Sequence, residues 1–362
     1  MATAVTADTL AEATLQLCRV PSVIGHEAAL CDLLEGWARG VFPAGQVRRV
    51  SNSLVLGRLE DARPTVVLLG HLDTVPAHPG DGPPRREGDR VHGLGSSDMK
   101  GAIAVMQALC ESLPLQALPV NPAVVLYERE EGPYLDNGLG PVLEAFPALA
   151  RAALGIALEP TDNRVQVGCV GTLHATLTFR GRSAHSARPW QGENAVHKAG
   201  ELLAELNALA RREVVFERLS FYEVMGVTRA SGGRARNVVP EAFELNLNYR
   251  FAPGKSLVEA QADVVAFVRG RAEVAFTDLC PSGRVPAGSP LYASLLRCAG
   301  APPEAKQAWT DVGRLSSAGM DAVNFGPGET AQAHQADESC SAAALLKGYE
   351  VLAAFLSGAQ VR

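Results

Sequence analysis

Short, uninterrupted apolar runs that lead into histidine or acidic side chains constrain this chain more than any other feature. The run 65–69, Thr-Val-Val-Leu-Leu, continues directly into Gly70-His71-Leu72-Asp73. A strand without polar alternation is buried on both faces, as in a mostly parallel sheet covered by helices. In such α/β sheets, ligands bind where the strands end. The sequence therefore predicts an α/β fold with a functional site at the ends of these runs.

Three later apolar runs end in the same way. The runs and the side chains after them are 123–127 with Glu130 and Glu131, 153–158 with Glu159, and 322–325 with His334. Asp98 lies between the runs 65–69 and 123–127, at the start of an expected helix. The apolar positions of that helix step by three and four, as one helix face requires (Ile103, Met106, Cys110, Leu113). This repetition predicts one shared site.

The residue types indicate metal chemistry. Imidazole nitrogen and carboxylate oxygen are good zinc donors, and carboxylates can bridge two divalent ions. His71 and Asp73 are two residues apart, so they point the same way if the strand continues through them. Two ions can activate a shared water, but a further carboxylate must carry the proton. Adjacent Glu130 and Glu131 can divide these roles, which predicts a two-metal hydrolase.

Each of these residues also has an ordinary structural interpretation. His71 alone could be a buried core histidine, and Glu130 with Glu131 could form a solvated loop. His334 lies among polar residues typical of a surface. The arrangement of several such side chains at strand ends favours the site over these separate explanations.

Five separated segments, in this order, resemble the zinc-dependent aminoacylase and carboxypeptidase family that includes acetylornithine deacetylase and succinyl-diaminopimelate desuccinylase. They are 70–76, 95–101, 130–131, 159–161 and His334. The resemblance implies a zinc-peptidase-like catalytic domain and two divalent metal ions, zinc with cobalt or manganese able to substitute.

The same resemblance assigns a role to each residue. Asp98 would bridge both ions, and the peptide bond to Met99 would be cis. The remaining ligands would be His71 and Glu159 at one ion and Glu131 and His334 at the other. Glu130 would be the general base, and Asp73 would orient His71 from behind.

Within the family, the chain resembles the actinobacterial type of succinyl-diaminopimelate desuccinylase. The supporting stretches are 159–162, 171–173, 183–188, 192–195, 237–240, 248–253, 309–311 and 324–328. This resemblance implies hydrolysis of N-succinyl-LL-2,6-diaminopimelate to succinate and LL-2,6-diaminopimelate in lysine biosynthesis. One departure removes an expected carboxylate contact: the proteobacterial type carries arginine just before the Gly-Ser/Thr-Leu strand, where this chain has Gly168-Cys169-Val170.

From about Gly168 the pattern changes to strict alternation. One face of the first strand would hold Leu173, Ala175, Leu177 and Phe179. The expected elements that follow are a helix over 196–210, strands over 221–228 and 242–251, a helix over 257–269 and a strand over 272–276. The order β-α-β-β-α-β predicts an inserted ferredoxin-like α+β domain over 168–280. Residues 1–167 and 281–362 would form the catalytic di-metal domain. The resemblance implies that the insert dimerises and reaches over the metal site.

Three residues of the predicted insert are candidates for substrate contacts. Arg250 lies on the polar face of its strand, and its planar guanidinium suits a carboxylate. Asn237 follows a Gly-Gly loop and could bond the same group. The resemblance would have both hold the succinyl carboxylate, with His185 of the facing subunit donating to the developing oxyanion. Arg250 could instead be a salt-bridged strand arginine, and His185 could merely cap a loop.

Composition limits the remaining possibilities. A length of 362 residues suggests two domains. The net charge of −6, without a basic run, makes nucleic acid and anionic membranes poor partners. No run reaches the roughly 18 apolar residues that a membrane span needs. Seven scattered cysteines predict reduced core thiols and a cytoplasmic protein.

Two alternatives to desuccinylation stay open. The enzyme could be an N-acetylornithine deacetylase or a related aminoacylase or dipeptidase, whose substrates lack the second carboxylate. The chain could also be a non-catalytic metal- or ligand-binding relative that keeps the fold. The presence of Glu130 argues against the second alternative, because a binding protein has no need of a general base.

Overall fold

The computed structural model describes residues 4–216 and 218–358, and their contacts separate into two compact units. The first unit contains Met1–Gly168, Gly283–Lys306 and Thr310–Arg362. The second contains Cys169–Ser282 together with the short segment Gln307–Trp309. We describe each unit by itself.

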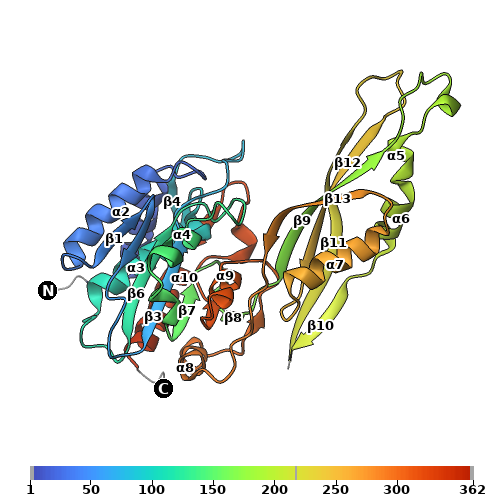
Figure 1. Ribbon diagram of the computed structural model, residues 1–362. Helices are drawn as coiled ribbons and strands as arrows, with labels where there is room; N and C mark the ends of the chain where they lie inside the picture. The colour runs from blue at the N-terminus through green and yellow to red at the C-terminus, as the bar shows by residue number, and fades with distance from the viewer. Residues whose placement is uncertain (1–3, 217, 359–362) are drawn as a thin grey trace. The chain divides into compact units, whose positions relative to one another are not determined.

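The first unit is built around an eight-stranded sheet whose centre is parallel (Figure 1). Its four central strands, in spatial order, are β6 (Asn121–Tyr127), β3 (Thr65–His71), β7 (Leu154–Ala157) and β15 (Ala322–Asn324). The outer strands are β1 (Val47–Val50) and β2 (Ser53–Leu56) on one side, and β8 (Gln166–Val167) and β14 (Glu304–Ala305) on the other. Nearly every residue of the four central strands is buried. The uninterrupted apolar runs therefore belong to a doubly covered parallel sheet, as predicted.

Helices cover this sheet. They are α1 (Ala7–Cys18), α2 (Ala28–Val41), α3 (Gly101–Ser112), α4 (Leu139–Ala145), α8 (Pro290–Ala299), α9 (Val312–Ser317) and α10 (Ala342–Leu356). Short turns lie at η1 (Ser96–Lys100), η2 (Leu149–Arg151), η3 (Pro189–Gln191) and η4 (Thr330–Gln332), of which η3 belongs to the second unit. Helices α1, α3 and α10 pack on one another, and α3 also contacts β3.

Helix α3 follows directly from the turn that carries Asp98. Its predicted apolar positions Ile103, Met106 and Cys110 are buried, whereas Leu113 lies just beyond the helix as its C-cap. The first helical residue must be glycine, because a Cβ on Gly101 would lie 2.6 Å from the carbonyl oxygen of Ser96. Helix and turn are thereby packed tightly against each other.

A small three-stranded sheet joins two distant parts of the first unit. It consists of β4 (Arg85–Glu87), β5 (Arg90–His92) and β16 (Ser339–Ser341), with β5 in the middle. The segment before Asp98 and the segment after His334 are therefore hydrogen-bonded to each other. The sequence did not predict this sheet, because its strands have only three residues each and are mostly polar.

The second unit contains a separate antiparallel sheet. Its spatial order is β10 (Arg212–Phe216), β11 (Leu219–Gly232), β12 (Ala242–Phe251), β9 (Gly171–Arg180) and β13 (Glu273–Cys280). Its helices are α5 (Ala195–Lys198), α6 (Gly200–Ala208) and α7 (Leu257–Val268). Without β10, the chain order and the strand order are those of a ferredoxin-like domain. The predicted α/β fold class with an additional α+β sheet is thus confirmed.

Two details of the second unit differ from the sequence prediction. The expected helix over 196–210 is divided at Ala199, and it ends at Ala208. The strand β10 was not predicted, because Arg212, Glu213 and Val215 are exposed and its pattern is not that of a buried strand. It pairs with β11 at the edge of the sheet.

The alternating residues of the second unit form its core. Leu173, Ala175, Leu177 and Phe179 of β9 pack with Leu245, Leu247, Tyr249 and Phe251 of β12. Helical residues such as Leu202 and Val264 complete the cluster. The residues between them on each strand, including His174, Asn248 and Arg250, lie on the other face of the sheet.

Two predictions from composition can be compared with the described residues. All seven cysteines fall among them; each is buried and none forms a disulfide. No helix in ranges 4–216 and 218–358 has both the length and the apolar character needed to cross a membrane.

Candidate metal centre

His71 is the last residue of β3, and its side chain is buried. Its Nδ1 lies 3.0 Å from the carbonyl oxygen of Asp73, and its Nε2 lies 3.1 Å from Oδ1 of Asp98. A proton on Nδ1 would be donated to that carbonyl, which leaves the lone pair of Nε2 directed toward Asp98. The main chain of Asp73 thus orients His71, while the Asp73 carboxylate lies 3.6 Å from Nδ1.

The carboxylate of Asp73 holds the loop after β6. One oxygen accepts the backbone N–H of Glu130, and the other accepts that of Glu131, both at 2.9 Å. Burial alone would raise the pKa of Asp73, but the hydrogen bond and charge of His71 and these two N–H groups lower it below its ordinary value. Asp73 therefore stays ionised and fixes two neighbouring glutamates relative to His71.

Asp98 lies in the turn before α3 and faces two imidazoles. Its Oδ1 is 3.1 Å from Nε2 of His71, and its Oδ2 is 3.5 Å from Nε2 of His334. Burial works to raise the pKa of Asp98, but its contacts with His334 and His71 outweigh burial and lower it. The peptide bond from Asp98 to Met99 is cis, as the family resemblance implies. Each oxygen of this carboxylate thus serves a different histidine.

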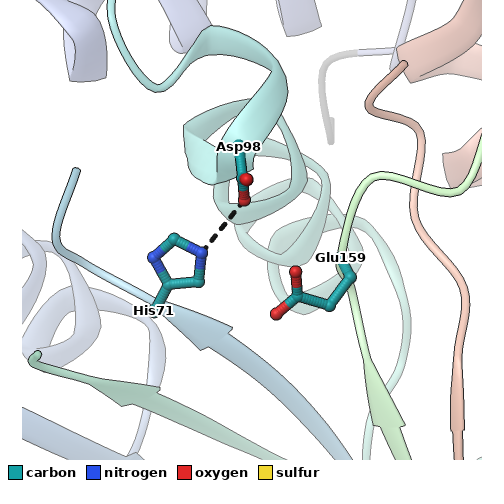
Figure 2. A group of neighbouring side chains, drawn as sticks. All are labelled: His71, Asp98 and Glu159. Carbon is teal, nitrogen blue, oxygen red and sulfur yellow. Dashed lines mark hydrogen bonds and ion pairs between the residues drawn. The ribbon is translucent and has the colours of Figure 1, made fainter. Parts of the chain in front are cut away.

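Glu159 follows β7 by two residues and points into the same space as His71 and Asp98 (Figure 2). Ligand-type atoms of these three buried side chains all lie within 4.8 Å of one another. The Oε1 atom of Glu159 is buried and has no hydrogen-bond partner among the described residues. Burial and the nearby Asp98 charge raise the pKa of Glu159 to about 7.

Glu131 and His334 form a second group with Asp98. Nε2 of His334 lies 2.8 Å from Oε1 of Glu131, and the ligand-type atoms of all three side chains lie within 4.8 Å. Hydrogen bonds to Asp98 and Glu131 raise the pKa of His334 to about 10. The His334 side chain is 51% exposed, in contrast to His71. The group of His71, Asp98 and Glu159 is therefore buried, whereas the group that contains His334 opens to solvent.

Glu130 lies beside both groups. Ligand-type atoms of Glu130, His71 and Glu131 also come within 4.8 Å of one another. Desolvation raises the pKa of Glu130 well above its ordinary value, and the charge of Glu159 adds to the shift. The structure thus brings together all seven predicted residues of the first unit (His71, Asp73, Asp98, Glu130, Glu131, Glu159 and His334).

This cluster fits divalent cations. Four carboxylates other than Asp73 converge with two imidazoles, and burial together with repulsion between the carboxylates raises the pKa of Glu130 and Glu159. A buried carboxylate oxygen without a partner, such as Oε1 of Glu159, is costly unless a cation or donor meets it. Nitrogen and oxygen donors of this kind suit zinc and similar ions. The buried His/Asp/Glu cluster is therefore consistent with a metal site.

In the second unit, Arg250 is half-buried on the polar face of β12. Its Nε donates to Oδ1 of Asn248 at 3.1 Å, and Nδ2 of Asn248 lies 3.1 Å from Oγ1 of Thr172 and 3.0 Å from Nε2 of His174. Within the described residues of this unit, no carboxylate forms an ion pair with Arg250. Burial lowers the pKa of its guanidinium. This arginine is held at its Nε atom by Asn248.

His185 and Asn237 lie together elsewhere in the second unit, and both are exposed. The N–H of Ser186 donates to the carbonyl oxygen of Asn237 at 2.9 Å, and His185 bridges with Val238. The Nδ1 of His185 accepts the N–H of Ala187 at 3.1 Å. Asn237 precedes β12, whereas Arg250 is near the far end of that strand. The eight residue-to-residue steps from Ala242 to Arg250 alone span about 26 Å, so the structure does not bring Asn237 and Arg250 together within one chain.

Comparison with known proteins identifies the family. A model of peptidase family M20/M25/M40 matches residues 67–358. The chain belongs to this family. The M20 chain is 35% identical to a Mycobacterium tuberculosis protein provisionally named succinyl-diaminopimelate desuccinylase DapE, over 96% of this chain and 98% of that protein. It is 33% identical to succinyl-diaminopimelate desuccinylase of Corynebacterium glutamicum, over 93% and 94% of the two chains.

A solved structure supports the M20 fold. The M20 family metallo-carboxypeptidase Sso-CP2 of Sulfolobus solfataricus superposes with a TM-score of 0.78 at 17% identity, over 96% of this chain and 98% of that chain. At this identity the likeness concerns the fold alone. Family membership makes the protein an M20 metal-dependent hydrolase, and the resemblance inferred from the sequence is confirmed.

Sequence reasoning missed two residues of this M20 hydrolase that support its candidate sites. Glu338 is 2% exposed and accepts backbone N–H groups from the turn that carries Asp98. Asn248 holds Arg250. Glu338 follows another acid, Asp337, in a polar loop, without an adjacent apolar run. Its only sequence signal is its position four residues after His334.

Proposed function

We propose that this protein hydrolyses N-succinyl-LL-2,6-diaminopimelate to succinate and LL-2,6-diaminopimelate, a step of lysine biosynthesis. The substrate class is supported by the two relatives, of which the Corynebacterium glutamicum protein is named for this reaction. The reaction class is supported by family membership. The observation that carries the proposal is the convergence of carboxylates and imidazoles on the two oxygens of Asp98.

The proposed metal ligands follow from this geometry. Asp98 would give one oxygen to each of two divalent cations, zinc with cobalt or manganese as substitutes. The further ligands would be His71 and Glu159 on the buried side and Glu131 and His334 on the open side. Such a pair of cations supplies Lewis acidity, which polarises an amide carbonyl and lowers the pKa of a water molecule.

Glu130 is the proposed proton carrier. Its backbone is fixed by Asp73, and its side chain lies beside both ligand groups. It would accept a proton from water as the water oxygen bonds to the succinyl carbonyl carbon. The same carboxyl would then give the proton to the amide nitrogen as the C–N bond breaks. Succinate and the free amine of LL-2,6-diaminopimelate result.

Residues of the second unit are proposed to recognise the substrate. Arg250 and Asn237 would hold the succinyl carboxylate, and His185 would stabilise the oxyanion from the facing subunit of a homodimer. Because Asn237 lies beside His185 and far along β12 from Arg250, we expect Asn237 to come from the facing subunit as well. Each site would then take Arg250 from one chain and the other two residues from its partner.

The proposed reaction is tested by turnover of N-succinyl-LL-2,6-diaminopimelate beside its N-acetyl analogue, with and without a chelator. We expect the succinyl amide to be cleaved with the higher kcat/KM, and the chelator to abolish cleavage until zinc is restored. Preference for the acetyl substrate would instead favour the deacetylase alternative. No hydrolysis of either substrate with saturating zinc would overturn the proposal.

The proposed dimer is tested by complementation. Arg250→Ala and His185→Ala subunits are co-expressed, and each is also purified alone. The assay uses substrate well below the wild-type KM, where the raised KM of Arg250→Ala makes that variant nearly inactive alone. In mixed dimers one site has both residues intact, so random pairing should then restore about a quarter of wild-type activity. Activity no higher than that of the separate variants would show that the two residues act within one chain or not at all.

A further inference from the structure

A buried carboxylate outside the proposed ligand set organises the turn that carries Asp98. Glu338 directs Oε2 to the N–H of Gly95 at 2.8 Å, and Oε1 to the N–H groups of Ser97 and Asp98 at 2.7 and 2.8 Å. The carbonyl oxygen of Glu338 also accepts the N–H of Gly93 at 2.9 Å. Four backbone N–H groups of residues 93–98 therefore donate to this single residue.

These bonds replace partners that the turn cannot supply. The non-helical φ and ψ angles of Asp98 and Met99 interrupt regular structure just before α3. The N–H groups of Ser96 and Lys100 bond to the carbonyl oxygens of Gly93 and Gly95 within the turn, whereas those of Gly95, Ser97 and Asp98 are met by the Glu338 carboxylate. Buried N–H groups without partners are costly. Glu338 satisfies them with charge-assisted hydrogen bonds. The direction of the Asp98 side chain seen in Figure 2 depends on this turn.

The loop that carries His334 is fastened to the same turn at its other end. The hydroxyl of Ser97 donates to the carbonyl oxygen of Glu329 at 3.0 Å and accepts the N–H of Glu329 at 2.7 Å. A Cβ on Gly328 would lie 2.1 Å from the carbonyl oxygen of Ser97, so the two backbones meet closely there. Ser97 and Glu338 thus bind the two ends of loop 329–338 to residues 93–98.

His334 lies midway along this loop and has little packing of its own. Its side chain is half exposed, and its backbone φ is 61°. Its Nε2 nevertheless lies 3.5 Å from Oδ2 of Asp98. Burial does not hold His334 at this distance. Its position depends on the contact of Nε2 with Oε1 of Glu131 and on the attachments of its loop at residues 329 and 338.

We propose that Glu338, together with the hydroxyl of Ser97, is a loop clamp that sets the spacing of Asp98 and His334 for the open-side cation. The clamp rests on the ligand set proposed above, and Glu338 acts as a positioning residue that touches neither metal nor substrate. Removal of the clamp should therefore weaken the open-side cation more than the buried-side cation. Residues that orient metal ligands change metal affinity by about 10- to 100-fold when substituted.

The substitution Glu338→Gln keeps the size of the side chain and changes its donors. An amide can present one oxygen, so its NH₂ group must face either Gly95 or the pair Ser97 and Asp98. In both orientations the side-chain NH₂ group faces a backbone N–H group, so two donors meet, and the negative charge of the carboxylate is lost. A matched control is Asp337→Asn, the same chemical change one residue earlier, where an exposed carboxylate pairs with Arg85 at 2.9 Å.

The experiment is titration of the metal-free proteins with Co²⁺, followed by calorimetry and visible absorption. Wild type and Asp337→Asn should bind two ions with the same affinities and spectra. Glu338→Gln should bind the first ion normally and the second about 10- to 100-fold more weakly, with a changed visible band. Wild-type affinities and spectra for Glu338→Gln would overturn the clamp. This holds even if the melting temperature falls, because a residue that only stabilises the fold would lower the melting temperature and leave metal binding unchanged.

Ser97→Ala keeps the experiment decisive if Glu338→Gln does not fold. It leaves the Ser97 N–H in place and removes only the hydroxyl, so the second ion should bind about 2- to 10-fold more weakly. Unchanged binding in Ser97→Ala would then overturn the clamp. The wild-type titration separates this outcome from failure of the proposed function. A wild type that binds fewer than two ions contradicts the ligand set, whereas two ions bound with wild-type affinities in every variant contradict only the clamp.

Discussion

The metal cluster of the first unit and the polar candidates of the second unit are built in different ways. Around Asp98, the side chains are mostly buried, and backbone N–H and carbonyl groups fix several of them. In the second unit, His185 and Asn237 are exposed, and Arg250 is held by one neutral side chain. The chemistry of a buried, pre-organised cluster is shared by a family, whereas an exposed recognition surface is easily changed. We therefore expect turnover and metal binding to depend on the first region and substrate choice on the second.

The largest effect should come from Glu130→Gln. Loss of the proton carrier should lower kcat about 10²- to 10⁴-fold, whereas the metal content stays at the wild-type value. Steady-state kinetics and elemental analysis measure the two quantities. The control is Glu128→Gln, which bonds to Asn52 instead of the cluster and should keep kcat. A Glu130→Gln variant with full turnover would remove this residue from the mechanism.

His71→Ala tests the buried side of the cluster. Without this imidazole the buried-side cation loses a ligand, and the dialysed protein should retain fewer ions than wild type, by elemental analysis. His78→Ala alters an exposed histidine seven residues later and should retain the full complement. If both variants keep the same metal content, His71 is not a ligand and the contrast between the two regions fails.

Arg250→Ala should act on substrate choice. The loss of charge-assisted hydrogen bonds to the succinyl carboxylate should raise KM for the succinyl substrate about 10- to 150-fold. The kcat for that substrate, the kcat/KM for the acetyl analogue and the metal content should change little. A fall in metal content, or an equal loss with both substrates, would mean that the two regions are not functionally separate.

Asn248→Ala should give the smallest effect. Its Oδ1 fixes Nε of Arg250. Because Asn248 would act on the substrate only by positioning this guanidinium, its loss should raise KM for the succinyl substrate by only about 2- to 10-fold. Kinetics of Asn248→Ala in the Arg250→Ala background sharpen the test. Because Asn248 is proposed to act through Arg250, the double variant should have the same KM as Arg250→Ala alone. A further rise in KM would show that Asn248 has a separate role.

Much of the fold was predictable because local pattern and tertiary environment agree. The runs ending at His71 and Tyr127 are apolar throughout, and both lie in the buried centre of the sheet. The alternation around Leu245 and Leu247 likewise matches a sheet with one face packed on helices. His71, Glu130, Glu131 and Glu159 could be named because they follow strands whose carboxyl ends share one edge of the sheet. The roles of Asp98 and His334 came from the family resemblance instead.

The remaining features depend on contacts between distant segments. Strand β16 pairs with β5 across about 250 residues of sequence, and neither has a recognisable pattern. The role of Glu338 can be recognised only in the folded structure, where its carboxylate accepts the N–H of Asp98. The position of Asn237 relative to Arg250 required the structure, because only the extent of β12 shows that this strand carries Arg250 away from Asn237.

The short segment Gln307–Trp309 has a practical consequence for anyone who wishes to excise the second unit. Gln307 exchanges two hydrogen bonds with the main chain of Tyr222, at 2.9 and 2.7 Å, and the indole of Trp309 donates to the carbonyl oxygen of Pro281. A fragment cut at residues 169 and 282 would leave this tripeptide behind and expose the groups it covers. A recombinant version of the unit would have to splice the tripeptide back on through a linker.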